Sequence, residues 1–486
     1  MNSLTFNGVR KPRIHLLKGR TKPPFPSIER GLLTIPGRDG ALLKTSKKQP
    51  LIINQPIGFV VTDDNDALQL KDQLAEWLVT EEPASLVFDD EPGRTYYALV
   101  QNTIEDFEKF ATLRSGTIQF LCPDPYSYGE EITQDLSTNS LITNNGTAET
   151  FPIFDIDVPQ SITRLEIKNK SLVDRQGASP SIVLGRAASM EQTEYVREEL
   201  IFNDTMQSTT SWQAATEVDN GYIAGEMGAD ASGFYPSLVG DAIKPYDWQG
   251  PSLIKGIGAS LQDFKADILV ESMNMGFGFE IGMFDVYLRD ANSNVIGKVS
   301  FGDAWQDKTE NFGKGQVGDY FTGKKLGVWA AYPAGWNNFD GILRIERIDN
   351  VWRFYYAQIA LDGSHNWVGS NTRFTDNANQ YMAPVTDVQV AFRSWPGTVR
   401  TDMRIKEIKL YRINPPASGN DSVPYIATVG DKLTIDSKKS LIAKNGEPRT
   451  DLVLLETQMF PLKTGLNQLE VSPGVKVTAK YRKAWL

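Results

Sequence analysis

Five aromatic residues in the second half of the chain lie in short segments rich in glycine, alanine and asparagine. Such segments favour loops, where an aromatic ring is free to contact a ligand. The ring can stack on the apolar C–H face of a pyranose, while nearby Asn, Asp and Gln side chains bond to its hydroxyl groups. The candidate saccharide-binding residues are Trp305, Trp329, Tyr332, Trp336 and Trp367.

Packing is the alternative role for each of these side chains. Tryptophan is large and mostly apolar, so it often fills a core or anchors a loop. Trp352 falls in the middle of a strand pattern beside Phe354, which makes it a poorer binding candidate than the five above. The sequence is compatible both with a saccharide site and with a module that has no ligand and serves as a spacer.

Residue types that catalyse hydrolysis are scarce. Two histidines, His15 and His365, leave little room for a Ser-His-Asp triad and exclude a multi-histidine metal site. A glycosidase needs two carboxylates facing one cleft, and residues i and i+2 of a strand share a face. Glu280 has glycine, and therefore no second carboxylate, two residues before it at 278 and two residues after it at 282. We therefore predict no catalytic residues, with a cell-wall glycan hydrolase or lyase as the alternative, because carboxylates of different strands could still meet.

Calcium and thiol chemistry have one candidate each. The loop at Thr375-Asp376-Asn377 carries the oxygen ligands that Ca²⁺ prefers, although acidic loops are commonly just solvated. Cys122 lies between Phe120-Leu121 and Pro123, so we expect a packed thiol rather than a nucleophile. We predict no metal site and no cofactor.

Alternating apolar residues predict an antiparallel β-sandwich around the aromatic candidates. Two strand patterns flank the two-residue turn Asp349-Asn350. Across 277–288 the apolar parity changes at Met283-Phe284, which predicts a β-bulge there. We expect residues 199–414, which hold eight of the ten tryptophans, to form a jelly-roll or concanavalin-like sandwich.

This module is expected to be inserted into a second β-sandwich. The strand-like segments Leu200–Phe202 and Ile408–Tyr411 would pair and bring the ends of the module together. The strand patterns on either side of the module are too few for two comfortable sandwiches. We predict that they share one core, with Phe151–Asp157 near Val475–Ala479, although two small β-domains in series are the alternative. The two parts are residues 129–198 and 421–486.

Residues 1–128 form a separate β-rich domain with one helix. Apolar residues at spacings of three and four predict that helix at Asp66–Leu78, with Trp77 packed into the core. The run Pro123-Asp124-Pro125 marks the end of the domain, because proline interrupts regular elements.

Several motifs, in their order along the chain, resemble the distal tail protein of siphophages that infect Gram-positive bacteria. In the first domain these are Ile35–Gly40 (IPGRDG), a helix ending in Trp77-Leu78, an Asp-Asp-Glu-Pro run before Tyr96-Tyr97, and Phe120–Pro125 (FLCPDP). At the C-terminus they are Leu462–Leu469 (LKTGLNQL) and Arg482–Leu486 (RKAWL). The chain length resembles that of "evolved" members, which carry carbohydrate-binding-module-like insertions.

The resemblance implies a structural role and no catalysis. It implies a homo-hexameric ring made by the N-terminal domain and a galectin-like sandwich split by the insert. The implied partners are further copies of the chain, the major tail tube protein, a tail-associated tip or fibre protein, and host cell-wall polysaccharide.

The bulk properties of the 486-residue chain agree with this interpretation. Its net charge of -10 argues against a general nucleic-acid binder. No run of 18 apolar residues occurs, and the first residues lack the apolar stretch of a secretion signal. We therefore expect synthesis in the host cytoplasm, no membrane insertion, and a place in the virion.

Overall fold

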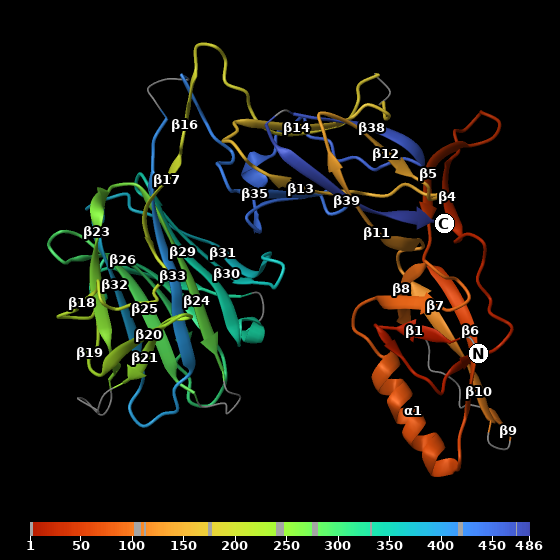
Figure 1. The fold of residues 1–486 in the computed structure, drawn as a ribbon, viewed down its shortest axis with the longest axis horizontal. Coiled ribbons are helices and arrows are strands. Elements are labelled where there is room, and N and C mark those ends of the chain that lie inside the picture. The colour runs from red at the N-terminus through yellow and green to blue at the C-terminus, as the bar shows by residue number, and fades with distance from the viewer. Residues whose placement is uncertain are drawn as a thin grey trace.

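The computed structural model is mainly β, as the sequence predicts, and contains one α-helix among the residues that it describes. Figure 1 shows three bodies: a β-rich body with the helix at the right, a sandwich at the top, and a larger sandwich at the lower left. Within the described ranges no helix is long and apolar enough to cross a membrane. The described residues are 3–101, 108–110, 113–173, 177–239, 247–274, 280–330, 333–416, 421–472 and 474–486.

The N-terminal body packs its helix against strands. Helix α1 (Asp64–Leu78) begins two residues before the predicted start, and the Asp63 side chain caps it by accepting a bond from the Asp66 amide. Trp77 is buried as predicted, and its Nε1 donates to the Phe6 carbonyl at 2.9 Å. Cys122 is also buried, which raises the pKa of its thiol to about 12 and confirms the packed thiol. The strands are β1 (Leu4–Phe6), β2 (Val9–Arg10), β3 (His15–Leu16), β4 (Ile28–Leu33), β5 (Leu42–Lys48), β6 (Leu51–Val60), β7 (Ala84–Phe88), β8 (Thr95–Val100), β9 (Glu108–Phe110) and β10 (Leu113–Cys122).

The upper sandwich is built from two distant parts of the chain. Strand β39 pairs with β13 at Phe154↔Ala479 and with β11 at Ile132↔Tyr481. The predicted proximity of Phe151–Asp157 and Val475–Ala479 is therefore present. A second sheet has the order β12-β38-β14-β15, and apolar side chains of both sheets share one core. The strands are β11 (Ser127–Leu136), β12 (Asn139–Asn144), β13 (Ile153–Asp157), β14 (Arg164–Asn169), β15 (Ser181–Gly185), β35 (Lys432–Asp436), β36 (Leu441–Lys444), β37 (Glu447–Pro448), β38 (Gly465–Val471) and β39 (Lys476–Trp485).

Two adjacent strands connect the upper sandwich to the larger one. Strands β16 (Thr193–Tyr195) and β34 (Ser422–Pro424) run parallel, and β17 (Glu198–Asp204) pairs with β33 (Asp402–Ile413). The predicted pairing of the module ends is confirmed, with a register shift between Leu200 and Phe202. The Asn414 amide donates to the Arg197 carbonyl at 2.8 Å, so the chain leaves and returns at one place.

The larger sandwich consists of two antiparallel sheets. One has the order β20-β21-β33-β24-β29-β30-β31 with β17 on β33, and the other has the order β18-β23-β32-β25-β26-β27-β28. The remaining bounds are β18 (Gln213–Ala214), β19 (Tyr222–Ile223), β20 (Glu226–Asp230), β21 (Gly233–Leu238), β22 (Gln249–Gly250), β23 (Ser252–Leu261), β24 (Phe264–Met273), β25 (Gly282–Arg289), β26 (Val295–Asp303), β27 (Phe312–Val317), β28 (Lys324–Val328), β29 (Phe339–Ile348), β30 (Val351–Ile359), β31 (His365–Thr375) and β32 (Val385–Arg393).

The β-bulge expected at Met283-Phe284 is wrong. Strand β25 keeps a continuous register with β26 there, and the irregularity lies at Leu288/Arg289. All eight residues of β25 are buried, because one face packs in the core and the other is covered by further chain. Apolar Met283 sits on the covered face, so the apolar pattern changed parity without a change of backbone. Residues 275–279 lie outside the described part.

An ion-pair network contacts both sandwiches. Arg344 of β29 binds Asp267 of β24 through Nε at 2.5 Å and Glu447 of the upper sandwich through Nη1 at 2.7 Å. The His365 amide also donates to the Gly446 carbonyl at 3.2 Å. The insert is thus docked as well as tethered.

Candidate functional site

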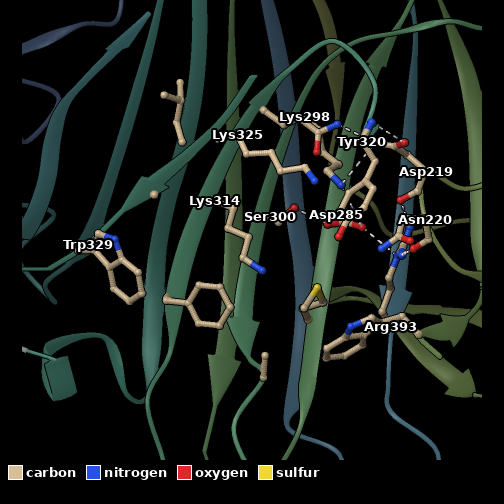
Figure 2. Close-up of a pocket in the computed structure, with 18 of the residues that line it drawn as sticks. Asp219, Asn220, Asp285, Lys298, Ser300, Lys314, Tyr320, Lys325, Trp329 and Arg393 are labelled. Atoms are coloured by element: carbon tan, nitrogen blue, oxygen red, sulfur yellow. Dashed lines mark hydrogen bonds and ion pairs between the residues drawn. The ribbon is translucent and has the colours of Figure 1, made fainter. Parts of the chain in front are cut away.

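A cavity of about 480 Å³ lies on the outer face of the seven-stranded sheet of the larger sandwich (Figure 2). Strand alternation positions its lining, because successive side chains point to opposite faces. On β26, Val299 and Phe301 enter the core, whereas Lys298 and Ser300 line the cavity. The same alternation brings side chains of β25, β27, β28 and β32 to the cavity.

Two glycines let this sheet pack closely on the opposite one. A Cβ at Gly313 would lie 2.4 Å from the Tyr356 ring, and one at Gly315 would lie 2.5 Å from the Phe354 ring. Aromatic rings of β30 occupy that space. The core face of β27 thus carries these two glycines and Val317, and the opposite face presents Phe312, Lys314 and Gln316 to the cavity.

The cavity floor is a buried network of charged groups centred on Asp285. Arg393 Nε lies 2.8 Å from an Asp285 oxygen, and Lys298 Nζ lies 3.9 Å away. The hydroxyls of Tyr287 and Ser300 also donate to this carboxylate. Opposite charges and donated hydrogen bonds of this kind stabilise the ionised carboxylate of a buried aspartate.

A segment before β19 closes the network from outside. The carboxylate of Asp219 accepts bonds from Gln316 Nε2 at 2.6 Å and from the Tyr320 amide at 2.8 Å. Lys298 Nζ lies 3.7 Å from the same carboxylate. Arg393 donates to the carbonyl groups of Asp219 and Asn220. Figure 2 shows these groups gathered at one side of the cavity.

The pKa values of this floor follow from burial and pairing. Burial opposes ionisation of Asp285, but Lys298 and Arg393 outweigh it and lower the pKa of the carboxyl. Burial lowers the pKa of Lys298, although Asp285 and Asp219 oppose that shift. Burial also raises the pKa of Tyr287 well above its usual value. Asp285 is therefore a poor proton donor, and the network suits recognition better than acid catalysis.

Aromatic rings surround the floor. Trp329 stacks on Phe312 with ring centroids 5.6 Å apart and an interplanar angle of 25°. Trp248 packs edge-on against Trp395 at 5.6 Å. Trp329 is 54% exposed and Trp305 is 45% exposed, so both offer ring surface to a ligand.

The loop of Trp305 is held by a buried carboxylate. Asp303 accepts bonds from the backbone amides of Trp305 at 2.9 Å and Glu310 at 2.8 Å. Burial raises the pKa of Asp303, and these two amide bonds oppose the shift. Its role here is to shape the loop that presents Trp305.

The structure separates the five predicted residues. It brings Trp305 and Trp329 together at the cavity. Trp336 is instead a core residue with no exposed surface, and its Nε1 donates to the Trp367 carbonyl at 2.7 Å. The binding role expected for Trp336 is therefore corrected to packing. Trp367 is 45% exposed but does not line the cavity, and Tyr332 lies outside the described residues.

Sequence reasoning missed several lining residues. Tyr320 and Trp248 are aromatic, and Lys314 and Lys325 are charged. The signal for Lys314 was an alternation of side chains with glycine, FGKGQV, in a strand whose core face carries two glycines and Val317. That pattern can be recognised only once partner rings for the glycines are known.

In the described part of the chain, no three His, Cys, Asp or Glu side chains gather where they could hold a metal ion. Asp376, the calcium candidate, is 2% exposed and accepts a bond from the Tyr381 amide at 2.7 Å. It therefore organises its own loop.

The two ends of the chain are similar to known phage tail proteins. Residues 10–122 match a family model described as phage tail protein RIFT-related domain, and residues 394–485 match one described as siphovirus-type tail component, C-terminal domain. The distal tail protein of Bacillus phage SPP1 is 32% identical over 146 residues, which make up 29% of this chain and 56% of that protein. The chain belongs to the distal tail protein family of siphophages. It spans about half the length of that curated relative and is a phage tail component of the virion.

Solved structures similar to this family member include distal tail and lectin-like proteins. The crystal structure of SPP1 Dit has a TM-score of 0.33 at 23% identity, covering 38% of this chain and 75% of that one. The CBM2 module of the evolved Dit of Lactobacillus casei BL23 phage J-1 has a TM-score of 0.35 at 13% identity, covering 46% and 98%. The VIP36 exoplasmic/lumenal domain, bound to Ca²⁺ and Man3GlcNAc, has a TM-score of 0.31 at 10% identity, covering 46% of this chain and 94% of that one. None of these likenesses fixes a ligand for this distal tail family member.

Proposed function

We propose that this chain forms a ring at the distal end of a siphophage tail and binds host cell-wall saccharide through its larger sandwich. Residues 1–128 would form the ring, residues 129–198 with 421–486 the galectin-like sandwich, and residues 199–414 the saccharide-binding insert. The ring would be a homo-hexamer that joins the tail tube protein to a tip or fibre protein.

The observation that carries the saccharide proposal is the cavity of the insert. Trp305 and Trp329 offer exposed rings beside a dense polar floor. This combination suits a pyranose, because a ring stacks on its C–H face while fixed polar groups bond to its hydroxyls. The volume of about 480 Å³ is in the ordinary range of ligand sites.

Avidity would make a weak site sufficient. Several copies of the insert on one ring share a high effective concentration over a repetitive wall surface. Multivalent binding can then exceed the affinity of one site by about 10²–10⁴. This mechanism needs no catalytic step, in keeping with a structural family.

A matched pair of tryptophans tests the proposal. Trp305 and Trp367 are equally exposed at 45%, but only Trp305 lines the cavity. The full-length Trp305→Ala variant should label host cell walls at least tenfold less well than wild type, and Trp367→Ala should label them normally. Equal labelling by both variants would leave the insert as a spacer. Release of reducing sugar from the wall would favour a hydrolase.

A further inference from the structure

The cavity carries an excess of positive charge in an acidic protein. Its charged lining residues are four cations, Lys298, Lys314, Lys325 and Arg393, and two anions, Asp219 and Asp285. The whole chain has a net charge of -10. A local field of opposite sign to the rest of the molecule concentrates anions at that place.

Two of the four cations account for the excess positive charge, because the other two are paired with aspartates. Lys298 and Arg393 are paired with the two aspartates of the floor, as described above. The described residues include no carboxylate within ion-pair distance of Lys314 or Lys325. Their ammonium groups lie instead over aromatic rings, Lys314 at 4.5 Å from the Phe312 centroid and Lys325 at 3.3 Å from the Tyr320 centroid.

The strand register brings these cations close together. Ser300 of β26 pairs with Lys314, and Gln316 of β27 pairs with Lys325. Lys314 and Lys325 are therefore diagonal neighbours on one face, at a distance that long side chains span. Figure 2 shows both side chains in the space between Trp329 and the Asp285 cluster. Like charges so placed repel each other and are stabilised by an anion between them.

The protonation behaviour of Lys314 agrees with this arrangement. Desolvation in the cavity lowers the pKa of its ammonium group, and Asp285 opposes that shift. The ammonium groups of Lys298 and Lys325 lower it further. A bound anion would reverse these effects and hold the charged form.

We propose that this cavity selects a glycan with an anionic substituent, which Lys314 and Lys325 bind while a sugar ring stacks on Trp329. The inference rests on the proposed saccharide function and adds its charge class. A phosphodiester and a uronate carboxylate share the chemistry required, because both accept charge-assisted hydrogen bonds from ammonium groups.

The test uses the full-length protein and wall polysaccharide from the host on which the phage plates. Hydrofluoric acid removes phosphodiesters from one portion, and carbodiimide reduction neutralises uronates in another. Wild type should bind native polysaccharide at least tenfold more tightly than the portion that has lost the recognised anion. The Lys314→Gln/Lys325→Gln variant should lose this preference, and the Lys314→Arg/Lys325→Arg variant should keep it. Lys324→Gln is the matched control, since Lys324 is exposed on the same strand but does not line the cavity.

Each outcome separates the charge class from the saccharide function. Equal binding of all portions by wild type, lost in Trp305→Ala, would overturn the anion inference and leave the saccharide function standing. A preference for native polysaccharide that survives Lys314→Gln/Lys325→Gln would also overturn it. No binding of any portion by wild type would overturn the proposed function itself.

Discussion

Replacing Trp336 by alanine should destabilise the larger sandwich far more than replacing Trp329. Trp336 has no exposed surface and packs on Phe301 at 5.6 Å, Phe339 at 5.8 Å and Tyr356 at 6.1 Å between ring centroids. Loss of a buried aromatic side chain of this size costs about 3–5 kcal/mol of unfolding free energy. For a body of this size, about 1 kcal/mol lowers the melting temperature by roughly 2–4 °C.

The expected drop in melting temperature for Trp336→Ala is thus about 8–16 °C, taking about 4 kcal/mol as the cost. Trp329→Ala should change it by only a few degrees, because over half of that side chain already contacts solvent. Calorimetry of the full-length chain measures both, and amide hydrogen exchange of β29 and β30 assigns the transition to this sandwich. A shift below about 2 °C for Trp336→Ala, or equal shifts for the two variants, would refute the packing role.

Three further outcomes are expected. A short Gly-Ser linker in place of residues 199–412 should leave the remaining chain folded and monodisperse by light scattering, because the two cut ends are neighbours on paired strands; aggregation would contradict this. Arg344→Met should lower the unfolding free energy measured by chemical denaturation by about 3 kcal/mol, because it leaves Asp267, whose side chain is only 14% exposed, with Lys265 Nζ at 4.0 Å as its remaining cation, whereas Glu447→Gln keeps the Arg344–Asp267 pair and should cost less. Affinity for an anionic glycan should fall as pH rises through the lowered pKa of Lys314, and the Lys314→Arg variant should lack this fall when both are titrated over the same pH range.

The global arrangement could be predicted because its signals are local. Val477 and Ala479 alternate with polar residues, which is the pattern of a half-buried strand that needs partners, and the structure provides β11 and β13. The strand-like ends of the insert indicated their own pairing for the same reason. Period-two patterns survive wherever one face is apolar and the other polar.

The site could be predicted only in part, because its signals depend on the opposite sheet. Trp336 follows Pro333 in a glycine-containing run that suggests a loop, but the run is a 3-10 helix whose last ring enters the core. Gly313 and Gly315 weaken the apolar alternation that would predict strand β27, because rings of β30 fill the core volume beside them. In both cases the contacts that decide the side chain's role come from residues distant in the sequence.

The single junction of the insert has an evolutionary consequence. The chain leaves and re-enters the upper sandwich where Arg197 and Asn414 are hydrogen-bonded, so the junction is one short seam. Recombination at this seam can exchange one cassette for another whose own ends pair, without repacking the core formed by β11, β13 and β39. Under the proposed function, wall recognition would diversify by exchange of this cassette while the proposed ring-forming part stays unchanged.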